Sequence, residues 1–407
     1  MYVELAILGA FAFIYSTIVG GVEKTAITGP IVFTAFGFIA GPLGIGWLEP
    51  DISNETLKYL ADITLAIVLF IDAAHADLRI LRRHIGIPGR MLLLGLPGVI
   101  GLGFLVGMFL FEELTWTGLA ILATILAATD AALGKAVIAN RAVPKEVREG
   151  LNVESGLNDG LCVPILFLLI AISLGNTGEG ETGTLALRLV VQELGIGLAV
   201  GLGVTAVGLW LISFGRERGW VTEVWAQMPV VTLAVTCFAI AQSLHGSGYI
   251  AAFVGGMLFG SVQKDATYKL VLAAEGTAEL LSLVIWVEFG TAVIAWAFDL
   301  ITWQAVVYGV LSLTLIRMLP IFLSLTGTGQ PVESKLFLGW FGPRGLASVV
   351  FALIVINNGV PGAQLIALVV AITVFFSLMA HGLSANPLAA AFARRMRHRQ
   401  SSQSPTE

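Results

Sequence analysis

The segment NVESGLNDG, residues 152–160, places two carboxylates inside a stretch that hydropathy marks as membrane. The apolar residues 161–174 follow it directly, and no basic residue adjoins Asp159. A charge near the bilayer centre costs about 2.5–3.5 kcal/mol on insertion scales, so an ionisable group there usually has a function. A carboxylate at this depth binds a hard cation such as Na⁺ through oxygen, or binds a proton. Because loss of hydration favours the neutral form, the proton and the cation compete for it.

Polar neighbours of Asp159 follow a helical spacing. Ser155 and Asp159 are four residues apart, as are Glu154 and Asn158, so each pair lies on neighbouring turns of one helix face. Ser155 is a candidate neutral oxygen ligand, although its hydroxyl could instead bond its own helix backbone. Asn158 can hydrogen-bond a backbone group or Asp130 without adding charge.

Two other spans are interrupted by helix-breaking sequence. The first break is ATDA at residues 128–131, where Asp130 competes with the helical backbone and an unwound turn frees carbonyls, such as that of Thr129, to ligate a cation. The alternative is a charged residue at a helix end near the cytoplasm, since Lys135 follows closely. The second break is GPRG at residues 342–345.

Glu154 needs a countercharge, and the spans offer two arginines, Arg317 and Arg344. Because a buried ion pair is more often structural than functional, we assign Glu154 to a structural pair with Arg317 and keep Arg344 as the alternative partner. Arg344 would otherwise compensate the dipole ends of the broken helix around it.

The composition defines a polytopic membrane protein. Of the 407 residues, 57% are hydrophobic and only 12% charged, whereas soluble domains carry about 25% charged residues. There is room for about thirteen spans of about 20 residues each, and we expect no cleavable signal peptide. Cys162 and Cys237 are expected to be packed as small hydrophobes. The sequence lacks a phosphate-binding Gly-Lys-Ser/Thr loop and a nucleophile elbow, so we do not expect an ATP-driven pump. We also expect no enzymatic activity, no cofactor and no nucleic-acid partner.

The histidines give no sign of a transition-metal site. We expect His75, His245 and His381 near helix ends, without the ligand-spaced acids or cysteines that such a site needs. Asp72 and Glu288 could line a proton path, or could be solvated acids at helix ends.

Charge in the loops predicts the orientation. Basic residues follow the odd-numbered spans, at Lys24, Arg79, Arg82, Arg83, Arg90, Arg141, Lys145, Arg148, Arg216, Arg218, Lys264, Lys269, Lys335 and the terminal Arg394, Arg395, Arg397 and Arg399. The other loops are acidic or neutral, at Glu49, Asp51, Glu112, Glu113, Glu179, Glu181 and Asp299, with Lys58 and Arg188 as exceptions. The positive-inside rule therefore predicts an outside N-terminus, a cytoplasmic C-terminus and an odd number of spans.

An internal repeat accompanies this topology. The two breaks lie about 213 residues apart, Asp72 and Glu288 about 216, and two Ala-Phe pairs about 217. An offset of an odd number of spans inverts the second copy. We divide the chain into a first repeat of spans 1–6 at residues 1–175, a linking seventh span at 176–220, a second repeat of spans 8–13 at 221–387 and a short basic cytoplasmic tail at 388–407.

Four segments together resemble the monovalent cation:proton antiporter-1 family, in its NhaP/sodium–proton exchanger branch. They are ATD at 128–130, ESGLNDG at 154–160, GYIAAFVGG at 248–256 and GPRG at 342–345. The resemblance implies an all-α fold of about thirteen spans with two inverted repeats and two crossing broken helices, a homodimer, and elevator-like exchange.

The resemblance also implies residue roles. Asp159 would bind either Na⁺ or a proton, and Asp130, the Thr129 carbonyl and Ser155 would complete the cation site, with Glu154 nearby through water. The Asn158–Asp159 pair goes in this family with electroneutral exchange. Two residues depart from the family pattern: Ala131 stands where proline is frequent, and Gly156 stands where leucine is common. Neither departure removes a ligand.

We therefore expect a secondary active antiporter of a prokaryotic cytoplasmic membrane that exchanges Na⁺, or else Li⁺ or K⁺, for protons. One alternative is a sodium-coupled organic-anion transporter of similar inverted-repeat fold, which would need an arginine such as Arg344 aimed at a carboxylate. The other is a transport-dead membrane sensor or subunit, although such a protein has no need to keep costly buried charge.

Overall fold

Helices make up the described part of the chain, in which no strand occurs. The structure is a computed structural model, and it describes residues 2–22, 25, 27–49, 55–76, 86–138, 140, 142–175, 182–263 and 267–403. Several charged loop residues used to predict the orientation lie outside the described residues, namely Lys24, Asp51, Arg79, Arg82, Arg83, Arg141, Glu179, Glu181 and Lys264.

The helices of the first half end with α9, which carries the NVESGLNDG segment. They are α1 (Tyr2–Val22), α2 (Gly29–Ala40), α3 (Glu55–His75), α5 (Pro88–Arg90), the π-helical turn η1 (Met91–Gly95), α6 (Leu96–Leu110), α7 (Trp116–Ile125), α8 (Ala131–Ile138) and α9 (Lys145–Gly175). Thr115 shows how local sequence starts a helix: its Oγ1 accepts from the Gly118 amide at 3.1 Å, which caps the first turn of α7.

The second half of the described chain also consists of long and short helices. It comprises α10 (Thr182–Glu217), the 3₁₀ turn η2 (Trp225–Gln227), α11 (Pro229–Ser243), α12 (Gly248–Val262), α13 (Thr267–Glu288), the π-helical turn η3 (Phe289–Val293), α14 (Ile294–Leu300), α15 (Trp303–Leu313), α16 (Leu315–Ser324), α17 (Val332–Trp340), α18 (Leu346–Asn357) and α19 (Ala363–Gln403). Ser247 and Thr302 cap α12 and α15 through their hydroxyl oxygens.

Length and hydropathy mark many of these helices as membrane spans. Among the described residues, seven helical stretches are long and apolar enough to cross a bilayer, and five further apolar helices of 10–17 residues accompany them. Two of the short helices, α7 and α18, are halves of the interrupted spans. The prediction of an all-α polytopic membrane protein is confirmed, whereas the count of thirteen stays a prediction.

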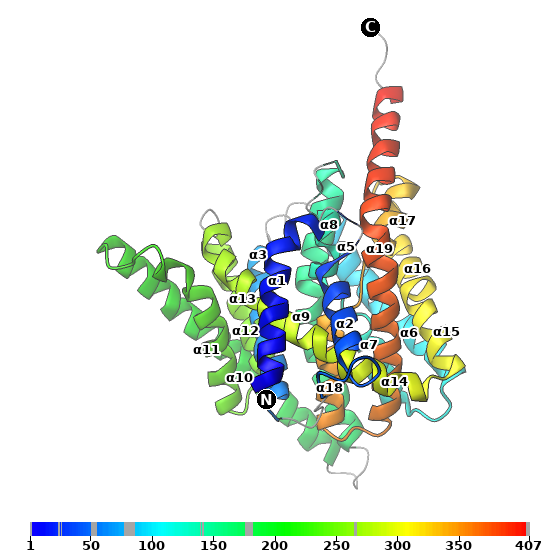
Figure 1. The fold of residues 1–407 in the computed structure, drawn as a ribbon, viewed down its shortest axis with the longest axis horizontal. Helices are drawn as coiled ribbons and strands as arrows, with labels where there is room; N and C mark the ends of the chain where they lie inside the picture. The colour runs from blue at the N-terminus through cyan, green and yellow to red at the C-terminus, as the bar shows by residue number, and fades with distance from the viewer. Residues whose placement is uncertain are drawn as a thin grey trace.

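The two chain ends lie at opposite ends of the helix bundle (Figure 1). The last helix, α19, continues through Pro387 to Gln403 and projects beyond the body of the bundle. The predicted boundary between residues 387 and 388 therefore falls inside a continuous helix. His381 lies well inside α19 and is fully buried, so the expectation that it sits near a helix end was wrong, because the helix continues through Pro387. His75 does end α3, and His245 lies two residues beyond the end of α11.

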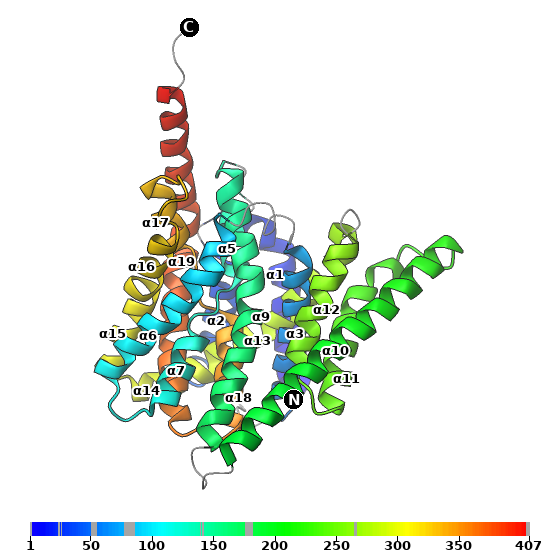
Figure 2. The ribbon, with the colours of Figure 1, turned by 180° about the vertical axis from the view of Figure 1, so that it is seen from behind.

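Glycines let α9 approach its neighbours at the level of the polar segment, where it packs against α3 and α12 (Figure 2). A Cβ added at Gly156 would lie 2.8 Å from the carbonyl oxygen of Asp72 on α3. A Cβ at Gly160 would overlap the ring of Phe253 on α12. The glycine at 156, a departure from the family pattern, thus has a packing reason, because a leucine there would collide with the α3 backbone.

Candidate functional site

The two interrupted spans meet at their breaks. The first helix pair is interrupted between the end of α7 at Ile125 and the start of α8 at Ala131, and the second between Trp340 of α17 and Leu346 of α18. Both breaks fall where the sequence predicted them. The Asp130 amide donates to the Pro343 carbonyl oxygen at 2.8 Å, which ties one break to the other.

Asp130 joins the starts of two helices at this crossing. Its Oδ1 accepts from the Leu133 amide of α8 at 3.4 Å, and its Oδ2 accepts from the Leu346 amide of α18 at 2.9 Å. A carboxylate at a helix N-terminus is stabilised by free backbone amides and by the helix dipole. Gly345 is required here, because a Cβ at this position would overlap the Asp130 carboxylate.

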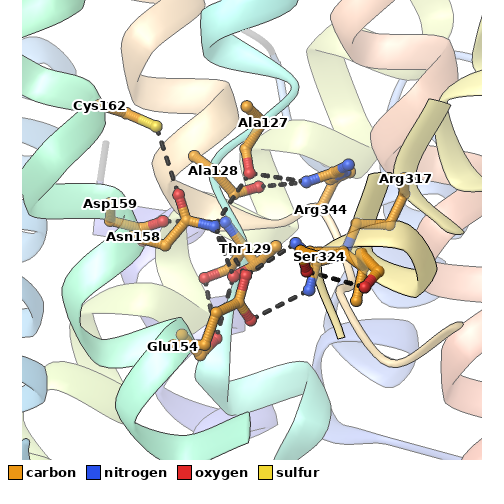
Figure 3. A network of polar contacts seen from close by, with 12 residues as sticks. Ala127, Ala128, Thr129, Glu154, Asn158, Asp159, Cys162, Arg317, Ser324 and Arg344 are labelled. Carbon is orange, nitrogen blue, oxygen red and sulfur yellow. Dashed lines mark hydrogen bonds and ion pairs between the residues drawn. The ribbon is translucent and has the colours of Figure 1, made fainter. Parts of the chain in front are cut away.

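Arg344 forms hydrogen bonds at the C-terminal end of α7, on the other side of the first break. Its Nη1 donates to the Ala127 carbonyl at 2.8 Å and to the Ala128 carbonyl at 3.0 Å, just beyond the C-terminus of α7 (Figure 3). Arg344 is fully buried. A cation beside these carbonyls compensates the negative end of the α7 dipole, which is the role we kept open for Arg344. Ser348 adds a second donor, since its Oγ donates to the Ile125 carbonyl at 3.1 Å.

Asp159 faces the first break from α9. Its side chain is only 3% exposed, and its Oδ1 accepts from the Thr129 amide at 3.0 Å. This hydrogen bond comes from a neutral donor, so it does not neutralise the carboxylate. No described basic side chain forms an ion pair with Asp159. Burial therefore destabilises the ionised form, and a proton or a bound cation would relieve that destabilisation.

Oxygen atoms of both elements gather beside this carboxylate. Ser155 Oγ donates to the Thr129 carbonyl at 3.0 Å and lies 3.3 Å from Thr129 Oγ1. The Ser155 hydroxyl therefore points from α9 to the first break. The position of Ser155 on α9 could not predict this direction. A carboxylate, a main-chain carbonyl and a hydroxyl are the oxygen ligands that hard cations prefer.

Asn158 holds the unwound segment in place. Its Nδ2 lies 3.1 Å from the Ala127 carbonyl, 3.2 Å from Thr129 Oγ1 and 3.1 Å from Glu154 Oε1. Its Oδ1 accepts from Cys162 Sγ at 3.4 Å. Figure 3 shows the Asn158 side chain extending from α9 to the break, which it links to α9 without adding a charge.

Glu154 is paired with Arg317 of α16. Nη1 of Arg317 lies 2.7 Å from Oε1 and Nη2 lies 3.0 Å from Oε2, so the guanidinium grips both carboxylate oxygens. Both side chains are 1% exposed. Gly342 of the second break lies against the guanidinium plane, where a Cβ would be 2.5 Å from Cζ. The six residues predicted to bind cation or proton, together with Arg317 and Arg344, thus meet at one crossing.

Sequence reasoning missed Ser348, Ser377 and Cys162 as parts of this network, and it missed the contacts of His381. Ser377 Oγ accepts from the Arg344 amide at 2.7 Å, and His381 contacts Ser377. A signal existed: Thr373, Ser377 and His381 recur every four residues in an otherwise apolar span. Such spacing puts three polar side chains on one helix face that must find partners inside the protein.

An all-helical membrane protein with two interrupted spans that cross beside a buried, oxygen-lined carboxylate is built as a secondary transporter. The sequence model of the family described as sodium/hydrogen exchanger, transmembrane, matches residues 9–391. The chain belongs to this family.

Individual relatives are distant. The chain is 25% identical over 393 residues to the K⁺/H⁺ antiporter NhaP of Alkalimonas amylolytica, covering 95% of this chain and 67% of that protein. It is 24% identical over 363 residues to the K⁺/H⁺ antiporter NhaP2 of Shewanella sp. strain MR-4, covering 87% of this chain and only 61% of that protein. The solved structure of the sodium proton antiporter MjNhaP1 from Methanocaldococcus jannaschii superposes with a TM-score of 0.74 at 22% identity, over 97% of this chain and 100% of that one. The fold is shared, although few residues are identical.

Proposed function

We propose that this protein is a secondary active antiporter that exchanges a monovalent cation, Na⁺ before Li⁺ or K⁺, for protons. The observation that carries the proposal is Asp159, a buried carboxylate that accepts a hydrogen bond from a neutral amide and lies beside the Thr129 carbonyl and the Ser155 hydroxyl. One such group binds a proton or a cation in turn, and alternating access of the site to the two sides converts this competition into exchange.

The ligands divide by chemistry. Asp159 is the exchanging group, the Thr129 carbonyl and Ser155 Oγ are neutral ligands, Asp130 adds a carboxylate, and Glu154 acts through water. Ser155 now donates its proton to the Thr129 carbonyl. A cation between the two oxygens would require the Ser155 hydroxyl to turn its proton away, so that both oxygens point at the ion.

A stoichiometry of one to one follows from which groups titrate. Glu154 forms an ion pair with Arg317, and the Asp130 carboxylate accepts hydrogen bonds from two backbone amides. Asn158 has no proton to exchange. Asp159 alone trades a proton for a cation, so each cycle moves no net charge.

The alternative of a sodium-coupled organic-anion transporter depended on Arg344 as a carboxylate receptor. The buried Arg344 guanidinium instead donates to the Ala127 and Ala128 carbonyls, which supports a structural role. The alternative of a transport-dead subunit is opposed by Asp159, which is costly to bury and forms no ion pair among the described residues.

The proposal also covers the membrane location, orientation and oligomeric state of the protein. We place the protein in the cytoplasmic membrane of a prokaryote as a homodimer, with the N-terminus outside and the C-terminus in the cytoplasm, acting on ions without enzymatic chemistry. The repeats are residues 1–175 and 221–387, joined by the span within 176–220, and the basic tail follows.

Reconstituted vesicles test the proposal. Protein in proteoliposomes with an entrapped pH dye should dissipate an imposed pH gradient when Na⁺, Li⁺ or K⁺ is added, whereas choline should have no effect. The K⁺ measurement matters because NhaP and NhaP2 are named as K⁺/H⁺ antiporters. The proposal is wrong if none of the three cations drives proton movement in vesicles that contain folded protein.

A further inference from the structure

Polar side chains on one face of α19 form hydrogen bonds to the second break. His381 Nε2 lies 2.9 Å from the Trp340 carbonyl oxygen, at the end of α17. One turn earlier, Ser377 Oγ accepts from the Arg344 amide at 2.7 Å. His381 and Ser377 are both fully buried. The segment between Trp340 and Arg344 is thus held at both ends by neighbouring residues of a single helix.

Both ring nitrogens of His381 have hydrogen-bond partners. A main-chain carbonyl can only accept, so Nε2 carries the proton that it donates to the Trp340 carbonyl. Nδ1 lies 3.2 Å from Ser377 Oγ and 3.1 Å from the Ser377 main-chain carbonyl oxygen. Ser377 Oγ, which contacts Nδ1, also accepts from the Arg344 amide. His381 therefore orients Ser377, and Ser377 orients the main chain at Arg344.

This chain of contacts continues to the cation site. Arg344 extends its guanidinium to the Ala127 and Ala128 carbonyls, and the next carbonyl along the chain belongs to Thr129. The neighbouring Pro343 carbonyl accepts the Asp130 amide. A displacement of residues 341–345 would move both contacts, and with them the oxygens that face Asp159.

We propose that His381 is a positioning residue that sets the cation affinity of the crossing through its hydrogen bonds to Trp340 and Ser377, and through Ser377 to Arg344. It touches no ion. The inference rests on the proposed exchange function, because its readout is the concentration of cation that the exchanger needs. A residue that merely filled space at this position would affect stability and leave that concentration unchanged.

The test compares substitutions that keep or remove the Nε2–H donor. His381→Gln places an amide N–H at a similar reach, and His381→Leu removes both ring nitrogens. Ser377→Ala breaks the next link and serves if the leucine variant does not fold. The matched control is Thr373→Val, one turn earlier on the same face of α19, because Thr373 is buried but bonds only its own helix at the Val369 carbonyl. Each variant is assayed in proteoliposomes for the apparent KM for Na⁺, and in detergent for melting temperature with and without Na⁺.

We expect His381→Leu and Ser377→Ala to raise the apparent KM by about fivefold, the effect on an equilibrium constant of losing one hydrogen bond, and to reduce Na⁺-dependent thermal stabilisation in parallel. His381→Gln and Thr373→Val should stay within about twofold of the wild type. The inference is overturned if His381→Leu or Ser377→Ala melts lower but keeps the wild-type KM, or if His381→Gln is impaired as much as His381→Leu. Failure of the wild type to exchange any cation would instead refute the proposed function, so the two failures are distinguishable.

Discussion

Removing Arg317 is the perturbation whose size the structure defines best. In Arg317→Ala, the Glu154 carboxylate loses the donors 2.7 and 3.0 Å from its two oxygens and keeps the amide of Asn158, a neutral donor, at 3.1 Å. Each charge-assisted hydrogen bond is worth about 1.5–3 kcal/mol. Stranding one member of a buried ion pair costs about 3–5 kcal/mol, which agrees with the loss of two such bonds.

A double-mutant cycle separates the pair from its surroundings. Arg317→Ala and the two single mutants of the cycle, Arg317→Gln and Glu154→Gln, should each melt well below the wild type in detergent and accumulate poorly in the membrane. Glu154→Gln combined with Arg317→Gln should recover part of the loss, because no charge is left unpaired. Arg317→Lys keeps the charge but not the two-pronged grip, so its melting temperature should lie between those of wild type and Arg317→Ala.

The assay is thermal unfolding in detergent, monitored by the fraction of protein that stays monodisperse. Exchange is then measured in proteoliposomes on each variant that can be purified in folded form. A well-folded Arg317→Ala protein with the wild-type melting temperature would refute the reasoning. So would a double mutant that loses as much stability as the two single mutants added together, because the two residues would then act independently.

Three further predictions concern the exchange itself. Asp159→Asn should leave a folded protein that moves neither Na⁺ nor protons, and exchange at a comparable rate in the pH-dye assay would contradict the assignment. Gly345→Ala should abolish or strongly reduce exchange because its Cβ overlaps the Asp130 carboxylate; Gly203→Ala on α10, where a Cβ meets nothing within 4 Å, is the control and should behave like the wild type. Under a Na⁺ gradient and a clamped potential, the final internal pH should not depend on voltage. An electrogenic cycle would behave differently, because its free energy changes by about 2.3 kcal/mol per charge moved per 100 mV.

The voltage measurement needs care in choosing the clamp. Valinomycin and K⁺ set the potential only if K⁺ is not transported, and NhaP and NhaP2 are named for K⁺. A permeant anion such as thiocyanate sets the potential without K⁺. A steady-state pH that follows the imposed potential would mean that a second proton is carried, with Asp130 as the first group to test.

The sequence predicted the breaks and the polar face of α9 because both leave local marks. Asp130 and the GPRG run disfavour helix where they stand, and a polar stripe inside an apolar span is visible from spacing alone. These features depend on residues within a turn or two of each other. The observed breaks, at residues 126–130 and 341–345, overlap both predicted segments.

The network beyond α9 could not be predicted, because it depends on which spans cross. The sequence kept both Arg317 and Arg344 as partners of Glu154, and only the packing of α16 against the crossing distinguishes them. The double capping by Asp130 joins residues more than 200 positions apart. The position of His381 was predicted wrongly because the sequence does not show how far the last helix extends: α19 continues through Pro387 to Gln403.

The pairing of the other charges at the crossing has a consequence for leakage. Glu154 balances Arg317, while the opposite charges of Asp130 and Arg344 each lie against helix ends of complementary polarity. The charges of these five side chains then sum to zero when Asp159 holds a proton or a cation, and to minus one when it holds neither. Moving that charge through an apolar interior costs about 2.5–3.5 kcal/mol, a factor of about a hundred. In the proposed exchange cycle, the empty carrier would therefore seldom cross, and few protons would return without a cation moving in exchange.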